Sequence, residues 1–208
     1  MCDETTESAH DAALARRGMT RREFAALGSA AALSACAGGT AGTGEGEDLR
    51  ERMARITTQD GIADAFFVHP AKGRHPGVIM WPDVAGPRDA MKIMARQLAA
   101  ANHAVLVVNP YYRSAPSPVM ESFSEYLRPE GRDRVTGYRA LLTPEAITRD
   151  ARAYAAFLDG DEAVDTARGI GASGYCMGGP FTIRAAAAVP ARVRAAASSA
   201  TIRPARTG

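Results

Sequence analysis

The chain has 208 residues, of which 25 are Lys or Arg, 23 are Asp or Glu and 46% are hydrophobic. This length and composition predict one ordinary globular domain, with or without an appendage, and exclude collagen-like, wholly disordered and disulfide-framework proteins. The formal net charge is +2, without the basic excess that nucleic-acid-binding domains carry, so we expect no nucleic-acid partner.

The first 36 residues predict an export signal. A polar leader over residues 1–19 precedes Arg21 and Arg22, and a short, weakly apolar stretch that ends in small residues follows them. This order predicts a secretory signal too short to span a bilayer permanently. The arginine pair with Phe24 resembles the twin-arginine signal, which implies the twin-arginine export machinery as a partner and a periplasmic or other extracytoplasmic location. The alternative is an amphipathic helix with two incidental arginines.

The four residues that end at Cys36 (LSAC) resemble a bacterial lipobox. Cys36 would then be acylated and become the first mature residue, and the protein would contact a membrane only through this lipid. Cleavage at a nearby small-x-small site is the alternative, and Met19 could be the true start codon. Residues 37–48, rich in Gly and Thr, are predicted to be a flexible tether, so the folded domain is expected to start near Leu49.

The rest of the chain alternates apolar runs with amphipathic stretches. Strands are expected over residues 62–68, 76–81, 104–108, 168–172 and 193–198. The simplest interpretation is that the first two of these strands pair with each other. Helices are expected over residues 88–101, 143–160 and 178–189, with short helices over 122–142. Thr143 is placed to cap the second of these, with Pro144 in its first turn. The alternation predicts an α/β fold with a mostly parallel sheet and helices on both faces.

One motif predicts nucleophilic chemistry. Residues 174–179 (GYCMGG) follow a predicted strand and precede a predicted helix. Their G-x-C-x-G-G spacing is that of a nucleophile elbow, with Cys176 in the place of the usual serine. In this strained turn the residues two positions before and after the central one must lack side chains. At a helix N-terminus Cys176 would be favoured as a thiolate, and the Met177 N–H would face the developing oxyanion. The alternatives are a buried structural cysteine and a phosphate-binding glycine loop, although the G-x-x-x-x-G-K-[ST] pattern is absent.

With residues 82–86 (PDVAG) and 110–116 (PYYRSAP), this motif resembles the dienelactone hydrolase family of the α/β-hydrolase fold over roughly residues 64–198. The resemblance implies hydrolysis of a lactone or other activated ester through an acyl-cysteine, with a small-molecule substrate and without metal or cofactor. It also implies particular site residues. Asp83 would contact the Cys176 thiol, the Val84 N–H would complete the oxyanion hole, and Arg113 would hold a carboxylate of the substrate. Aspartate is one methylene shorter than the family's glutamate, and an arginine in a Pro-rich loop could equally be solvated.

An α/β-hydrolase triad runs in the order nucleophile, acid, histidine. The 32 residues after Cys176 contain no His, Asp or Glu, and His10, His69, His75 and His103 all precede it. We expect His69, His75 and His103 to be solvated loop residues. We also expect a partial hydrolase domain over 49–198, with the last strands missing, an uncovered apolar strand from Val193, and an unstructured tail over 199–208.

Three hypotheses follow for the activity. The chain could belong to the hydrolase family and be impaired by the loss of the acid and the histidine. It could remain an enzyme in which Asp83 and the helix terminus alone activate Cys176. It could also be an exported lipoprotein that binds a small carboxylate without turnover, through Arg113 and the backbone N–H groups of the elbow.

Overall fold

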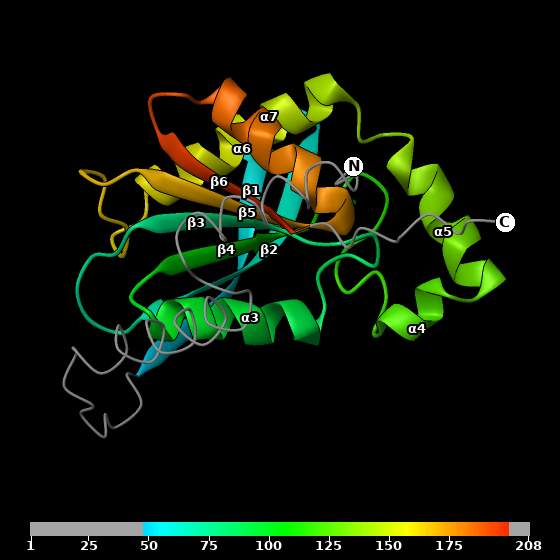
Figure 1. Ribbon diagram of the computed structural model, residues 1–208, viewed down its shortest axis with the longest axis horizontal. Coiled ribbons are helices and arrows are strands. Elements are labelled where there is room, and N and C mark those ends of the chain that lie inside the picture. Colours follow the sequence, from blue (N-terminus) through cyan, green and yellow to red (C-terminus); the bar gives the residue numbers. More distant parts are fainter. Residues whose placement is uncertain (1–47, 200–208) are drawn as a thin grey trace, which may run out of the picture. The chain divides into compact units, whose positions relative to one another are not determined.

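The computed structural model describes residues 48–199, which form one six-stranded sheet with the strand order β1-β2-β4-β3-β5-β6 (Figure 1). The predicted leader, Cys36 and all but the first residue of the predicted tail lie outside the described residues. The pairs β4–β3, β3–β5 and β5–β6 are parallel, whereas β1–β2 and β2–β4 are antiparallel. The strands are β1 (Leu49–Thr58), β2 (Gly61–Pro70), β3 (Gly77–Trp81), β4 (Ala104–Val108), β5 (Ile170–Tyr175) and β6 (Val193–Ser199).

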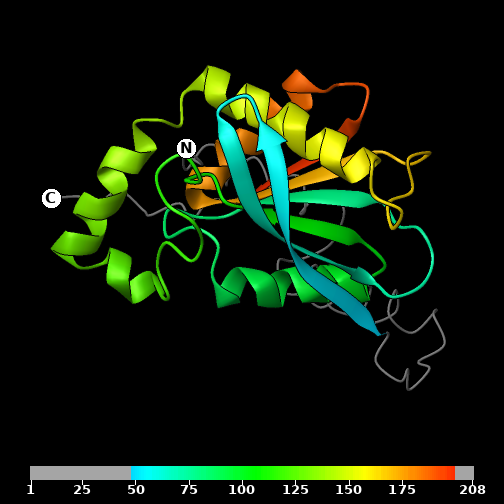
Figure 2. The same ribbon diagram turned by 180° about the vertical axis from the view of Figure 1, so that it is seen from behind.

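Helices cover both faces of this sheet, which confirms the predicted α/β architecture (Figure 1, Figure 2). One face packs on α3, and the other packs on α6 and α7. Among the described residues, no helix is both long and apolar enough to cross a membrane. The helices are α3 (Asp89–Ala100), α4 (Phe123–Tyr126), α5 (Pro129–Arg139), α6 (Pro144–Asp159) and α7 (Gly179–Ala188).

The core consists of two apolar layers separated by the sheet. Every residue of β3 and β4 is buried, as expected for continuous apolar strands covered on both faces. Because side chains alternate along a strand, Ile79 and Trp81 pack towards α6 and α7, while Val78 and Met80 pack towards α3. The parallel strands end at a common edge, and the loops that follow them there carry the predicted site residues.

The predicted pairing of residues 62–68 with residues 76–81 is wrong. β2 pairs with β1 on one side and with β4 on the other, so β3 is separated from β2 by β4. β1 itself was not predicted because it is a charged edge strand in which only Ala54 and Ile56 are buried. Two buried positions in ten residues are too few to produce a clear alternation of apolar and polar residues.

The other predicted elements are confirmed, with boundaries that move by a few residues. The Thr143 hydroxyl accepts a hydrogen bond from the Ala146 N–H at 3.2 Å, and Pro144 is the first residue of α6. The strand predicted over 168–172 is β5, which runs on to Tyr175 and therefore ends directly before Cys176.

β6 is the last strand in the order of the described sheet. Only its first residue, Val193, is buried, and the six residues after it are exposed. The prediction of an uncovered strand from Val193 is therefore confirmed. Most of the exposed side chains are small, because the strand sequence is VRAAASS.

Candidate active site

Cys176 lies exposed at the edge where the parallel strands end. It follows β5 directly and has a φ of +49°. A left-handed φ is uncommon for any residue other than glycine, and such strained conformations occur mainly at functional sites. Cys176 opens a short 3₁₀ turn, Cys176–Gly178, that leads into α7. The backbone thus has the strand–turn–helix geometry that the G-x-C-x-G-G motif predicts.

Two glycines of the motif allow the elbow to pack against the end of β3. A Cβ on Gly178 would lie 2.5 Å from the Pro82 carbonyl oxygen and 2.6 Å from that of Trp81. A Cβ on Gly174 would overlap the Gly178 backbone. Because Cβ atoms do not approach backbone atoms so closely, both positions require glycine. The close approach holds the elbow rigidly beside the turn that contains Asp83.

Asp83 is buried in the turn after β3 and is paired with Arg88. Each of its carboxylate oxygens accepts a hydrogen bond from the Arg88 guanidinium at 2.8 Å. Oδ1 also accepts from the Ala85 N–H at 2.9 Å, and the Asp83 carbonyl accepts from the Gly86 N–H at 3.0 Å. Among the hydrogen bonds of residues 48–199, none joins Asp83 to Cys176. The predicted contact with the thiol is not formed here, because Arg88 engages both oxygens of the shorter aspartate side chain.

The two residues predicted to form the oxyanion hole, Val84 and Met177, belong to one apolar cluster with Tyr111. The Tyr111 hydroxyl donates a hydrogen bond to the Val84 carbonyl oxygen at 2.9 Å and lies 3.2 Å from the Met177 sulfur. No described residue accepts a hydrogen bond from the Val84 N–H. The Met177 N–H belongs to the first turn of a helix, where N–H groups have no partner within the helix. Among the described residues, two backbone donors are therefore available, one in the turn after β3 and one in the elbow.

Arg113 is held by carboxylates of the protein itself. Its guanidinium donates to both oxygens of Asp150, at 2.7 and 2.9 Å, and to Asp60 at 2.6 and 3.0 Å. The Arg113 side chain is only 10% exposed, and Asp150 is fully buried. No ion pair or hydrogen bond in the described part of the chain joins Arg113 to the elbow. The predicted role on a substrate carboxylate stays a prediction, and these contacts weigh against it.

The three described histidines are engaged away from Cys176. His69 Nδ1 lies 2.7 Å from the Pro70 carbonyl oxygen, and His103 Nδ1 lies 3.2 Å from that of Leu98. His75 is buried rather than solvated as predicted, with Nε2 2.8 Å from a carbonyl oxygen in its own turn. Within residues 48–199 no group of three or more His, Cys, Asp or Glu side chains is arranged to hold a metal ion.

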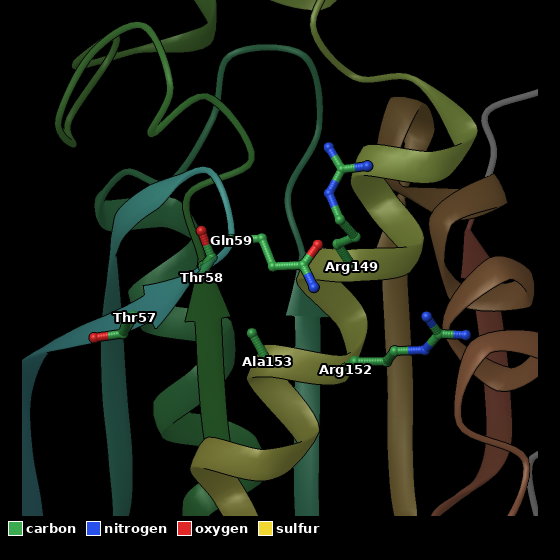
Figure 3. Close-up of a pocket in the computed structure, with 6 residues that line it drawn as sticks. All are labelled: Thr57, Thr58, Gln59, Arg149, Arg152 and Ala153. Atoms are coloured by element: carbon green, nitrogen blue, oxygen red, sulfur yellow. The ribbon is translucent and has the colours of Figure 1, made fainter.

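A pocket of about 300 Å³ lies apart from the elbow, between the β1–β2 turn and α6 (Figure 3). Gln59 extends from the turn towards α6, whereas the Arg152 side chain points away from the turn. Arg149 also lines this pocket, but its guanidinium is paired with Asp60 at 2.7 Å. None of the lining residues belongs to the elbow or to the turn after β3, so this pocket is not the candidate active site.

Two residues at the site, Arg88 and Tyr111, were not predicted. The sequence offered a signal for each. Arg88 is the only basic residue in the stretch between β3 and α3, and Tyr111 lies three residues beyond β4, inside a motif already associated with the site. Their partners depend on how the loops after different strands meet, which the spacing of residues along the chain does not specify.

The known proteins that resemble this chain include the following three. A "Putative carboxymethylenebutenolidase" of Methylorubrum extorquens strain AM1 is 27% identical over 168 residues, which are 80% of this chain and 54% of that protein. A crystal structure of a dienelactone hydrolase-like promiscuous phosphotriesterase, P91, from metagenomic libraries has 22% identity and a TM-score of 0.53, covering 66% of this chain and 54% of the other. A crystal structure of a "Putative Dienelactone Hydrolase" from Klebsiella pneumoniae has 17% identity and a TM-score of 0.55, and the match covers 67% of this chain and 55% of the other.

The chain thus spans about half the length of these relatives. At such low identities the solved structures establish the fold, which is that of α/β hydrolases. A family model described as "Dienelactone hydrolase family" matches residues 63–202, a range that contains the turn after β3, the Tyr111 loop and the elbow. Because this match covers more than half of the chain, and because the elbow has the geometry its motif predicts, the chain belongs to the dienelactone hydrolase family.

Proposed function

We propose that the protein cleaves a lactone or other activated carboxylic ester through a covalent acyl-enzyme on Cys176. The observation that carries this proposal is the exposed thiol at a left-handed φ, at the start of a helix and beside two unpartnered backbone donors. The curated relative is named as a carboxymethylenebutenolidase, which is consistent with a lactone substrate.

In the first step the Cys176 thiol loses its proton to water and the sulfur attacks the carbonyl carbon of the ester, so that a C–S bond forms while the carbonyl electron pair moves to oxygen. The N–H groups of Val84 and Met177 hydrogen-bond this oxyanion. The C–O bond to the alcohol then breaks, the alcohol takes a proton from water, and a thioester on Cys176 remains. Water attack on the thioester releases the carboxylic acid and regenerates the thiol.

The rates of the two steps are expected to differ. No imidazole or carboxylate in the described part of the chain makes a hydrogen bond to Cys176, so no side chain of residues 48–199 is placed to supply or remove a proton there. Attack by an intrinsically nucleophilic sulfur on an activated ester needs little such help, whereas attack by water on the thioester needs a general base. The residues 48–199 therefore favour accumulation of the acyl-enzyme over rapid turnover.

The test is to mix the full chain with p-nitrophenyl acetate, follow the release of p-nitrophenolate, and locate the acetyl group by peptide mass spectrometry. We expect one equivalent to be released quickly, with the acetyl group on the peptide that contains Cys176. The variants are Cys176→Ala, which should lose the fast phase, and Cys176→Ser, which should keep the elbow but slow the fast phase strongly. Background labelling is measured with Cys2→Ala and Cys36→Ala. A fast phase that survives in Cys176→Ala would disprove the proposal.

We further propose that the protein is exported by the twin-arginine route and carries a lipid on Cys36, on the basis of the sequence around Arg21 and Arg22. Replacing both arginines with lysine keeps the charge and should leave a tagged protein in the cytoplasm. Cys36→Ala should abolish incorporation of labelled palmitate without blocking export. Export that persists in the lysine variant, or lack of palmitate in the wild type, would contradict the respective part of this proposal.

A further inference from the structure

Tyr111 joins the two loops that meet at the elbow. It follows β4, and its side chain is only 1% exposed, among residues from the turn after β3, from α5 and from the elbow. Its ring lies against Gly86, which has a φ of +77° and whose added Cβ would be 3.5 Å from the ring. Its hydroxyl reaches the Val84 carbonyl oxygen and the Met177 sulfur. Tyr111 thus touches both residues proposed to donate to the oxyanion, without itself being one of the donors.

The hydrogen bonds of the turn after β3 fix the orientation of the Val84 N–H. This N–H shares a planar trans peptide with the Asp83 carbonyl, which points towards the Gly86 N–H at 3.0 Å. The Val84 N–H must therefore point the opposite way, out of the turn. The next peptide is fixed at both ends, because Tyr111 donates to the Val84 carbonyl and the Ala85 N–H donates to the Asp83 carboxylate. Of these three contacts, only the one from Tyr111 comes from another segment of the chain.

The environment of Tyr111 keeps its hydroxyl protonated. Burial is the main factor that raises the pKa of Tyr111, and the nearby charges of Asp83 and Cys176 raise it further, while Arg139 lowers it. The phenol therefore remains a neutral donor over the whole working pH range of a hydrolase.

The loop that carries Tyr111 is anchored on both sides. On one side the Asn109 side chain accepts from the Tyr111 N–H at 3.0 Å and donates to Asp64 of β2 at 2.9 Å. On the other side Arg113 is held by Asp150 of α6. Tyr111 lies between these anchors, so the hydroxyl is delivered to the turn by a rigid loop. This gives Arg113 a positioning role for the Tyr111 loop.

We infer that Tyr111 is a positioning residue for the oxyanion hole, whose hydroxyl fixes the turn that presents the Val84 N–H and couples it to the elbow through Met177. The inference rests on the proposed function, because it requires that acylation of Cys176 develop an oxyanion. It predicts that removal of the hydroxyl slows reactions that pass through an oxyanion and leaves other reactions of the same thiol unchanged.

The test compares two reactions of Cys176 in the full chain. Acylation by p-nitrophenyl acetate develops an oxyanion, whereas alkylation by iodoacetamide is a direct displacement at carbon and develops none. Tyr111→Phe should slow acylation about 10-fold, less than the loss of a whole oxyanion donor, and leave alkylation within about 2-fold of the wild type. The matched control is Tyr138→Phe, because the Tyr138 ring lies 5.9 Å from that of Tyr111 and its hydroxyl makes no hydrogen bond among the described residues.

The outcomes separate the two proposals. If the wild type is alkylated but not acylated, the proposed function fails. If the wild type is acylated and Tyr111→Phe is acylated equally fast, the inference fails and the proposed function stands. Equal loss of both reactions would also overturn the inference, since it shows general damage to the elbow. Should Tyr111→Phe not fold, Arg113→Lys loosens the same loop from its far side, and it must lower the ratio of acylation to alkylation by about 3-fold or more.

Discussion

Asp83 and Asp150 are both buried, and both are held through two oxygens by one arginine, but their pairs connect different parts of the molecule. Asp83 and Arg88 are five residues apart and close a single turn beside the elbow. Asp150 and Arg113 are 37 residues apart and join α6 to the loop after β4. Asp150 also accepts a hydrogen bond from the Tyr112 hydroxyl at 2.8 Å.

The difference indicates separate roles for two chemically similar pairs. When the carboxylate of a buried pair that joins distant segments is removed, the arginine is left charged among buried groups. Loss of such a pair therefore destabilises the folded state. A pair confined to one turn holds no distant segments together, and the arginine of the Asp83 pair compensates a negative charge in the turn beside the elbow. We therefore expect variants of Asp150 to change mainly stability, and variants of Arg88 to change mainly the reactivity of Cys176.

The largest expected effect is that of Asp150→Asn. The substitution removes the buried one of the two carboxylates that hold Arg113, leaves only the partly exposed Asp60 to balance its charge, and should lower the free energy of unfolding by about 3 kcal/mol, a large part of the stability of an ordinary domain. The measurement is urea unfolding followed by circular dichroism.

The matched control is Asp159→Asn. Asp159 is paired with Arg192, and the two side chains are 33% and 22% exposed, so its loss should cost only about 0–1 kcal/mol. Equal losses in the two variants would show that the Asp150 pair does not join the segments as we describe.

The second effect is on reactivity. Arg88→Gln removes the positive charge that compensates Asp83, and an uncompensated carboxylate near a thiol disfavours the thiolate. Alkylation of Cys176 by iodoacetamide at pH 7 should slow about 3- to 10-fold, and added salt should reduce the difference. Arg96→Gln removes an equal charge from a surface pair with Glu51 and serves as the control. A rate equal to that of the control would mean that the Asp83 charge does not act on the thiol.

The sequence predicted the parts of the fold that repeat a local pattern. The apolar runs of β3 and β4, the cap of α6 and the strand–turn–helix order at Cys176 each depend on residues a few positions apart. β1 was missed because its ten residues bury only two side chains, and its place in the sheet depends on pairing with β2.

The candidate site was predicted in part for the same reason. The Cys176 elbow is a local feature, whereas the partners of Asp83 and Arg113 are selected by three-dimensional contacts. Arg113 illustrates this, because Asp60 and Asp150 reach it from the β1–β2 turn and from α6. A family motif assigns a residue its position in the chain, but the neighbouring carboxylates of this particular chain determine what its guanidinium can bind.

The smallest expected effect concerns Asp60, the exposed end of the pair network around Arg113. Hydrogen bonds from Arg113, and then from Arg149, lower the pKa of Asp60 below its ordinary value of 3.8. A carboxylate whose pKa is lower in the folded state stabilises the fold above the unfolded pKa, and this contribution is lost as the pH falls through the folded pKa.

Asp60→Asn should therefore lower the melting temperature slightly near pH 6, and the gap to the wild type should close as the pH falls below about 4. Asp133→Asn, at an exposed position of α5 with no ion pair among the described residues, should show no such gap. A gap that stays constant down to pH 2 would mean that Asp60 acts through hydrogen bonds of the turn rather than through its charge.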